Sequence, residues 1–157
     1  MLGRLADALR PQLGANSAMI GIHTGGAWLA ERLHAQLGMA TPLGTMDIAF
    51  YRDDYNQKGL ARDPKRTQIP FDVGGKDILL VDDVLFTGRT VRAAVNELFD
   101  YGRPASIALA VLADRGGRQL PICAQYCGGR VEVPAGARLR LRRAEDGRLS
   151  FGLEHGA

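Results

Sequence analysis

The chain has few cysteines and no long apolar run. Its 157 residues include two cysteines, Cys123 and Cys127, which cannot form the disulfide framework of a small secreted domain or complete a zinc site. We therefore expect two buried free thiols and a cytoplasmic location. No apolar stretch approaches the roughly 18 residues that a membrane-spanning helix needs, so we expect no membrane partner. The first residues lack a long apolar core and a small-residue cleavage site, so no secretory signal is predicted.

No charge of either sign dominates the composition. Lysines and arginines number 20 against 17 acids, which gives a net charge of +3 and a pI near 9.1. Hydrophobic residues make up 46% of the chain and charged residues 24%, a profile typical of a soluble globular protein. The sequence also lacks internal repeats and low-complexity linkers, so we predict a single domain over residues 1–157. The mildly basic balance permits a polyanionic partner without requiring one.

The arginines are concentrated toward the end of the sequence. In "RLRLRR" (residues 138–143) arginine and leucine alternate, which places them on opposite faces of a predicted strand. Two interpretations remain open: a solvated outer face over a small apolar layer, or a face that contacts phosphate or RNA. The arginines of this region are Arg138, Arg140, Arg142, Arg143 and Arg148.

Hydrophobic periodicity and helix-breaking residues predict strands that alternate with helices. The expected helices cover residues 2–10, 27–37 and 90–101, and the expected strands cover 18–22, 45–51, 76–82 and 106–112, with an edge strand within 122–129. Residues 52–76 have charges, glycines and prolines but no period, which predicts a flexible lid or binding loop. Short strands around turns at 134–136 and 145–147 are expected in a C-terminal extension, about 130–157.

The alternation of strands and helices predicts an α/β fold with a mostly parallel sheet. The strands at 76–82 and 106–112 are apolar on both faces, which indicates central positions. In such sheets, ligands bind beyond the carboxyl ends of the strands. Residues 23–26, 82–90 and 114–117 should therefore lie together at one edge of the sheet.

The stretch "ILLVDDVLFTGRT" (residues 78–90) has the most specific pattern. An apolar strand ends on two acids, Asp82 and Asp83, and a Thr-Gly-Arg-Thr turn then precedes a helix. A nucleoside triphosphatase would need a G-x-x-x-x-G-K-[ST] loop upstream, and "GGKD" at 74–77 does not match it. A phosphoacceptor receiver domain would have its acids near the N-terminus and would lack this turn.

The residue types in this stretch suit a sugar phosphate. Gly88 permits a tight turn, and backbone N–H groups at the start of the following helix form a ready phosphate site. Thr87 and Thr90 add hydroxyl donors, and Arg89 adds positive charge. The two carboxylates nearby can each accept a hydrogen bond from a sugar hydroxyl. Phosphate at one end and a diol at the other describe a ribose 5-phosphate.

This stretch resembles the phosphoribosyl-pyrophosphate (PRPP) motif of type I phosphoribosyltransferases. Residues 18–127 resemble one subfamily, the bifunctional pyrimidine operon regulator/uracil phosphoribosyltransferase (PyrR) family. The resemblance rests on "IGIHTGGAWLAERL", "DIAFYRDD" and the run from "VDDVLFTGRTVRAA" through "GRPASIALAVLADRGGRQLP". It implies the type I phosphoribosyltransferase fold: a mostly parallel sheet flanked by helices, with a small hood from the terminal segments.

The resemblance also implies a reaction, in which uracil and PRPP give uridine monophosphate (UMP) and pyrophosphate. In this pentosyltransferase step of UMP salvage, Asp82 and Asp83 hold the ribose hydroxyls and favour a cationic sugar. Mg²⁺ is held mainly by substrate and water, without direct protein ligands. The 5-phosphate is cradled by Val84, Leu85, Phe86, Thr87, Gly88, Arg89 and Thr90. Purine enzymes typically carry Asp where Phe86 stands, which counts against a purine substrate; simple packing of Phe86 is the alternative.

Pyrophosphate and base contacts follow from the same resemblance. Thr24 and Gly25 match the pyrophosphate loop, although well-known members carry Arg at the position of Gly25, and Arg52 either contacts pyrophosphate or forms a surface ion pair. The base is expected against Asp114 or Arg115. Cations of the loop that would close over the substrates, or only keep it soluble, include Arg62, Lys65 and Arg66.

The resemblance implies a second activity, the binding of pyrimidine leader mRNA in response to uridine nucleotides so that transcription terminates early. It further implies a homodimer or larger homo-oligomer. Two alternatives remain open. One is a nucleotide-sensing RNA-binding attenuator with little or no catalysis, which the missing positive charge at Gly25 favours. The other is a phosphoribosyltransferase for another base.

Overall fold

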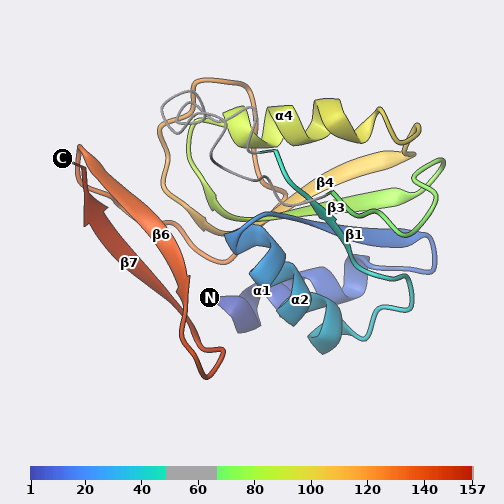
Figure 1. Cartoon of the computed structure of the whole chain (residues 1–157), viewed down its shortest axis with the longest axis horizontal. Helices are drawn as coiled ribbons and strands as arrows, with labels where there is room; N and C mark the ends of the chain where they lie inside the picture. The colour runs from blue at the N-terminus through green and yellow to red at the C-terminus, as the bar shows by residue number, and fades with distance from the viewer. Residues whose placement is uncertain (49–66, 157) are drawn as a thin grey trace.

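The computed structural model describes residues 1–48 and 67–156 of the chain. Within these residues, five strands form one parallel sheet in the order β2-β1-β3-β4-β5, and β6 and β7 form a separate antiparallel hairpin (Figure 1). The strands are β1 Ser17–Ile22, β2 Gly44–Met46, β3 Asp77–Leu85, β4 Ser106–Asp114, β5 Tyr126–Cys127, β6 Ala137–Arg143 and β7 Leu149–His155. The helices are α1 Leu2–Leu9, the 3₁₀ turn η1 Arg10–Gln12, α2 Gly25–Leu37 and α4 Arg89–Leu98. The α/β class and the mostly parallel sheet are confirmed.

The two faces of the sheet are both buried, because successive side chains of a strand point to opposite sides. Ile20, Leu80 and Val111 belong to one apolar cluster, while Met19 and Ala110 belong to the other. Helix α4 covers the first face, and α1 and α2 cover the second (Figure 1). Continuous apolar runs in β3 and β4 follow from this two-sided burial, as predicted.

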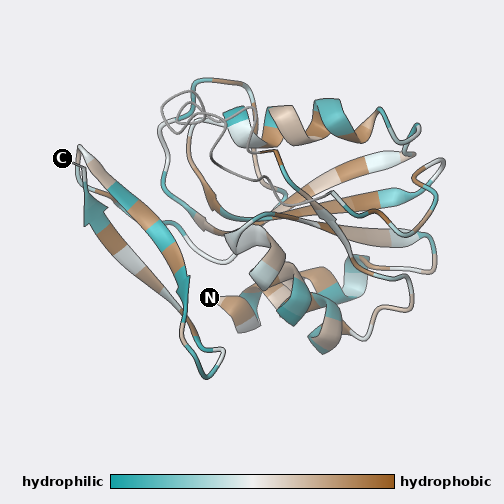
Figure 2. Cartoon of the chain, in the orientation of Figure 1, coloured by the Kyte–Doolittle hydropathy of each residue, from teal (hydrophilic) through white to brown (hydrophobic). Residues whose placement is uncertain are grey.

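The hairpin of β6 and β7 lies beside the sheet, against α2 and β3. Ala137 and Leu141 are each only 4% exposed and face the body of the protein. The arginines that alternate with them point outward, so apolar and polar residues alternate along β6 (Figure 2). The predicted separation of arginine and leucine faces is therefore confirmed.

Two strand boundaries differ from the prediction. The predicted strand 45–51 ends at Met46 in the described part of the chain. Thr45 also pairs antiparallel with Gln68, and Asp47 N–H donates to Thr67 Oγ1 at 3.0 Å. Residues 49–51 lie outside the described part. Strand β3, predicted to end at residue 82, continues to Leu85 because Asp82, Val84 and Leu85 still pair with β4.

The helix boundaries also differ slightly. Helix α2 begins at Gly25, two residues before the predicted start, and α4 ends at Leu98 instead of continuing to residue 101. Beyond Leu98 the N–H groups of Asp100 and Tyr101 donate three residues back, which tightens the chain into a turn. In the described part of the chain, no helix is both long and apolar enough to cross a membrane.

The prediction of two buried thiols is wrong. Cys123 is exposed and Cys127 is half-buried, because both lie in the irregular segment and short strand at the edge of the sheet. Cys127 Sγ donates to Gly129 O at 3.2 Å. Both cysteines are free.

Residues 67–76 are the described part of the loop predicted over 52–76. They contain no helix or strand beyond the bridge at Gln68. Val73 is 1% exposed, and Ile69 and Phe71 pack against the cluster under α4. This end of the predicted loop is therefore anchored to the core.

Candidate functional site

Three predicted segments meet at the carboxyl edge of the sheet. Residues 23–26 follow β1, residues 82–90 include the end of β3, and Asp114 ends β4. Strands β1, β3 and β4 are parallel neighbours, so their carboxyl ends lie side by side. The fold thus brings together most of the residues that the sequence singled out.

The two acids are oriented by their own backbone. Asp82 is 5% exposed, and its Oδ1 accepts the N–H of Asp83 at 2.9 Å. Asp83 is half-buried, and its Oδ1 accepts the N–H of Val84 at 2.9 Å. Consecutive residues of a strand point to opposite faces: Asp83 lies against Gly25 of α2, whereas Asp82 lines the small cavity before α4.

The β1–α2 turn (residues 23–26) is packed directly against these acids. A Cβ on Gly25 would overlap the Oδ2 of Asp83, and one on Gly26 would lie 2.6 Å from Val81 O. Any side chain at position 25 therefore requires Asp83 to move.

The β3–α4 turn (residues 86–88) encloses a small cavity. Gly88 precedes α4 with φ of 94°, a left-handed conformation that favours glycine, and Thr87 Oγ1 accepts the N–H of Arg89 at 3.2 Å. Among the described residues, none accepts a hydrogen bond from the N–H groups of Phe86, Thr87 or Gly88. The cavity measures about 110 Å³ and is lined by Asp82, Val84, Leu85, Phe86, Thr87, Gly88, Thr90 and Val91.

This turn can hold an anion. N–H donors at the start of the ten-residue helix α4 carry partial positive charge, so a phosphate group is favoured there. The Arg89 side chain points elsewhere, since its Nε donates to Gln119 Oε1 at 3.0 Å. The turn therefore offers backbone groups and hydroxyls rather than a guanidinium.

A second, larger cavity lies beyond β4. It measures about 510 Å³ and is lined by Asp114, Arg115, Gly116, Arg118, Arg130, Val131 and Glu132. Both residues predicted to contact a base line it. Sequence reasoning gave no role to Arg118, although it lies in the quoted run "GRPASIALAVLADRGGRQLP". It also missed Arg130 and Glu132, which lie in a later irregular stretch that has no motif.

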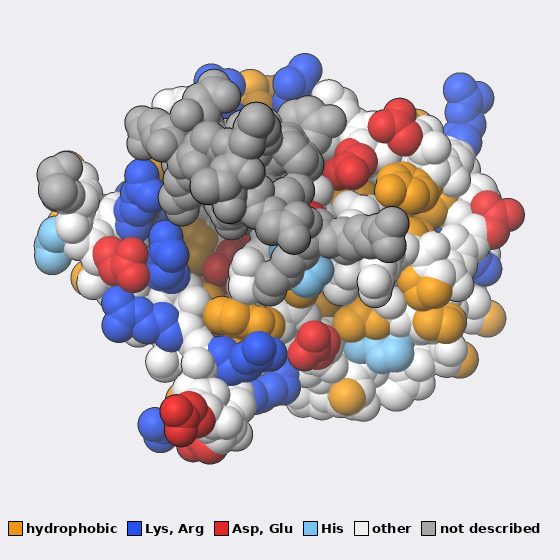
Figure 3. Space-filling view, in the orientation of Figure 1, with side chains coloured by type: hydrophobic (Ala, Val, Ile, Leu, Met, Phe, Trp, Pro, Cys, Tyr) orange, Lys and Arg blue, Asp and Glu red, His pale blue; other side chains and the backbone are white. Residues whose placement is uncertain are grey.

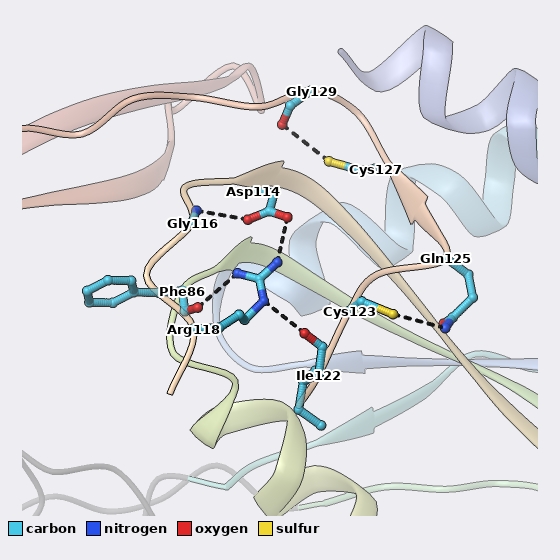
Figure 4. A network of polar contacts seen from close by, with 9 residues as sticks. All are labelled: Phe86, Asp114, Gly116, Arg118, Ile122, Cys123, Gln125, Cys127 and Gly129. Atoms are coloured by element: carbon cyan, nitrogen blue, oxygen red, sulfur yellow. Dashed lines mark hydrogen bonds and ion pairs between the residues drawn. The ribbon is translucent and has the colours of Figure 1, made fainter. Parts of the chain in front are cut away.

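Asp114 and Arg115 are held by contacts within the protein. Asp114 Oδ2 accepts from Arg118 Nη2 at 2.5 Å, and its Oδ1 accepts the Gly116 N–H at 2.9 Å (Figure 4). The hydrogen bond from Arg118 is the main reason that the pKa of Asp114 is lowered from its ordinary value. Arg115 Nη1 donates to Ala137 O, and its guanidinium lies 3.9 Å from the centroid of the Phe86 ring.

Among the remaining predicted site residues, Thr24 belongs to the described part of the chain and four cations do not. Thr24 caps the start of α2 without a side-chain hydrogen bond to the helix. Four predicted cations lie outside the described residues: Arg52, Arg62, Lys65 and Arg66. In the described part of the chain, no cluster of three or more His, Cys, Asp or Glu side chains could hold a metal.

The outward face of the hairpin is rich in arginine. Figure 3 shows Lys and Arg side chains gathered on the side of the molecule that β6 and β7 occupy. Arg140 and Arg142 each lie 3.3 Å from Glu154, so one carboxylate is shared between two cations. Arg143 stacks over Trp28 at 4.7 Å, which ties the end of β6 to α2.

Comparison with known proteins identifies relatives over most of the chain. A family model described as "Phosphoribosyl transferase domain" matches residues 3–133. The "Bifunctional protein PyrR" of Nitrosococcus oceani is 53% identical over 140 residues, which cover 88% of this chain and 78% of the relative. Its counterpart in Ralstonia nicotianae is 53% identical over 91% of this chain and 84% of the relative. That of Pseudomonas aeruginosa is 46% identical over 90% and 85%.

Solved structures share the fold. A purine phosphoribosyltransferase from Pyrococcus horikoshii is 29% identical with a TM-score of 0.62, covering 83% of this chain and 80% of the other. A hypoxanthine-guanine phosphoribosyltransferase from Bacillus anthracis has a TM-score of 0.65 at 16% identity, covering 83% and 74%. At that identity the likeness concerns the fold alone.

Proposed function

The chain belongs to the phosphoribosyltransferase family and, within it, to the PyrR proteins, and from this premise we propose that it converts uracil and PRPP into UMP and pyrophosphate. The observation that carries the proposal is the β3–α4 turn. There, N–H groups that have no partner among the described residues belong to the lining of a cavity that Asp82 also lines, and Asp83 is the next residue of the strand. Phosphate and ribose hydroxyls are the two groups that such a site suits.

In the proposed reaction Asp82 and Asp83 act on the ribose. Their carboxylates accept hydrogen bonds from the 2- and 3-hydroxyls and so hold the sugar in place. As the bond from the anomeric carbon to pyrophosphate breaks, positive charge develops at that carbon, and the two negative charges stabilise it. Uracil N1 forms the new bond to the same carbon, and the N1 proton passes to the departing pyrophosphate or to solvent. No covalent intermediate with the protein is needed, because positioning and electrostatics suffice. Residues 84–90 hold the 5-phosphate, and Thr24 and Gly25 approach the pyrophosphate by backbone.

The residues present fit a magnesium ion that substrate oxygens and water hold. Two adjacent carboxylates reach the site, fewer oxygen ligands than Mg²⁺ takes, and each already accepts a backbone N–H. When bound, the ion would neutralise charge on the pyrophosphate leaving group. The nearby carboxylates Asp82 and Asp83 would orient it through the sugar hydroxyls.

Uracil is the proposed base. Phe86 has no group that can exchange a proton with a purine; the residue is 45% exposed, and its ring lies beside the Arg115 guanidinium. The base would lie in the cavity at the end of β4, against Asp114 or Arg115, although the contact itself stays a prediction. Arg52 and the loop cations Arg62, Lys65 and Arg66 stay predictions for pyrophosphate binding and closure.

UMP formation tests the enzymatic proposal. Purified protein is given PRPP and Mg²⁺ with uracil, orotate or hypoxanthine in separate reactions. We expect a nucleotide product in the reaction with uracil and none in the reactions with orotate or hypoxanthine. Product with another base would overturn the base assignment. UMP binding without any product would favour the nucleotide sensor, for which Gly25 in place of arginine is the specific observation.

We further propose binding of pyrimidine leader mRNA, supported by the outward arginines of β6. Arg138, Arg140 and Arg142 are exposed on one face, and clustered cations supply the salt-dependent part of RNA affinity. A gel shift of a leader transcript with and without UMP tests this role. We expect binding that UMP strengthens and that salt weakens. Absent or salt-independent binding would contradict it.

Two further predictions, on cellular location and on oligomeric state, belong to the same proposal. Free, partly exposed cysteines support a reducing compartment, and we propose the cytoplasm. Assembly into a homodimer or larger oligomer, which family membership implies, stays a prediction that sedimentation of the purified protein tests.

A further inference from the structure

Residues 115–120 form a second layer behind the β3–α4 turn, and we call them the backing loop. Its groups take up three consecutive carbonyl oxygens of the chain that leads into the turn. Arg115 N–H donates to Leu85 O at 3.1 Å, and Arg118 Nη1 donates to Phe86 O at 2.9 Å. The N–H groups of Gln119 and Leu120 donate to Thr87 O at 3.0 and 3.2 Å.

These hydrogen bonds fix the direction of the N–H groups in the turn. In a planar trans peptide the carbonyl and the following N–H point to opposite sides. Since the carbonyls of Leu85, Phe86 and Thr87 face the backing loop, the N–H groups of Phe86, Thr87 and Gly88 face away from it. Those are the N–H groups without a partner among the described residues. The backing loop thus keeps the donors of the turn available for an anion.

Arg118 makes the side-chain contact in this arrangement, whereas the other three donors are backbone groups that any non-proline residue supplies. Its planar guanidinium contacts three parts of the chain at once (Figure 4). Nη1 donates to Phe86 O, Nη2 donates to Asp114 Oδ2 at 2.5 Å, and Nε donates to Ile122 O at 2.9 Å. A lysine has one nitrogen at the end of a flexible stem and cannot span three fixed acceptors in this way.

We propose that Arg118 is a positioning residue for the anion site. By holding the Phe86 carbonyl outward it orients the Thr87 N–H toward the 5-phosphate, and through Asp114 it ties this turn to the cavity proposed for the base. It touches no reacting atom. The proposal rests on the proposed function for the identity of the anion, a nucleoside monophosphate.

Binding of UMP, measured by calorimetry without turnover, tests the role. Three variants are compared with the wild type: Arg118→Ala, Arg118→Lys and the control Arg103→Ala. Arg103 is exposed and precedes β4, at the edge of the sheet opposite the anion site. Its replacement changes the net charge by the same amount as the replacement of Arg118, but away from the site. We expect Arg118→Ala to bind UMP about tenfold more weakly or worse, because a charge-assisted network is lost. Arg118→Lys should weaken it less, and Arg103→Ala should stay within twofold.

Rescue by free guanidinium ion separates positioning from a general loss of structure. At millimolar, non-denaturing concentrations the ion can refill the space left in Arg118→Ala, so we expect UMP affinity to recover in that variant and not in Arg103→Ala. UMP affinity within twofold of wild type in Arg118→Ala would overturn the proposal, as would a loss that guanidinium does not restore. If Arg118→Ala does not fold, Arg118→Lys decides: unchanged affinity in a protein of unchanged melting temperature would overturn it.

The outcomes also separate this proposal from the proposed function. If the wild-type protein binds UMP but does not form it, the proposed enzymatic function is overturned. The effect of Arg118 on UMP binding can still be measured in that case. Wild-type protein that makes UMP while Arg118→Ala binds it normally removes only the positioning role. Wild-type protein that binds no UMP overturns both.

Discussion

Two turns at the same edge of the sheet share a Thr-Gly dipeptide but use the glycine for different reasons. Thr24-Gly25 begins α2 and Thr87-Gly88 begins α4. Gly25 is needed for space, because a Cβ there would overlap Asp83. Gly88 is needed for conformation, because its φ of 94° is strained for any other residue.

The difference shows that one topology supplies two kinds of surface. The β1–α2 turn packs against the carboxylate of Asp83, whereas the β3–α4 turn lines a cavity with its N–H donors and is held from behind by the backing loop. A glycine in a strand-to-helix turn therefore does not by itself identify an anion site. The surrounding contacts decide which role it has.

Removal of the Asp83 carboxylate should have the largest effect on enzymatic activity. We expect Asp83→Ala to lower kcat/KM for UMP synthesis by about 10² to 10³, the magnitude typical of one electrostatic stabiliser of the transition state. The control is Asp77→Asn at the other end of β3, where the carboxylate bonds Asn16 and Ser106 away from the site. A loss below tenfold in Asp83→Ala would contradict the assigned role.

Gly25→Ala should reproduce part of that loss without removing the acid. The new methyl group displaces the Asp83 carboxylate, so we expect kcat/KM to fall by about ten- to hundredfold, a size seen when catalytic groups are misplaced. In the double variant with Asp83→Ala, the glycine substitution should add nothing. Gly3→Ala, which meets open space in α1, is the control. Additive losses would show that Gly25 acts independently of Asp83.

Gly88→Ala should affect stability more than Gly25→Ala does. A left-handed alanine costs about 1–2 kcal/mol, and its Cβ would also lie 3.1 Å from Ile122. Urea unfolding measures the change in the free energy of unfolding. Gly75→Ala, at φ of 74° in open space, isolates the conformational part. An equal loss in both variants would show that the contact with Ile122 has no effect.

The smallest effect is expected from replacement of Asp114, which accepts hydrogen bonds from Arg118 and Gly116 of the backing loop. The pKa of Asp114 is lowered from 3.8, first by the hydrogen bond from Arg118, so the ionised carboxylate stabilises the folded protein. That stabilisation is present above pH 3.8 and is lost as the pH falls through the lower folded-state pKa. Asp114→Asn should therefore reduce the free energy of unfolding by about 1 kcal/mol or less at neutral pH. Unfolding curves should converge in more acidic solution; a constant difference would contradict the assignment.

Much of the site could be predicted because its signals are local. The apolar run into Asp82 and Asp83, and the Thr-Gly turn before a helix, depend on neighbours in sequence, and the fold places them as predicted. The end of β3 was placed three residues too early, because pairing with β4 continues through two acids that interrupt the apolar pattern. The predicted burial of Cys123 was wrong for a related reason: short segments at the edge of a sheet bury little side-chain surface, whatever their composition.

The sequence alone determined the alternation of strands and helices, the parallel sheet and the edge at which its polar residues meet, because these follow from periodicity and turn chemistry along the chain. Only the tertiary structure decided that Asp83 occupies the space beside Gly25 and that Arg118 bonds Phe86, 32 positions away. Such contacts join residues that are remote in sequence. They depend on how strands and loops pack in three dimensions, which no local pattern records.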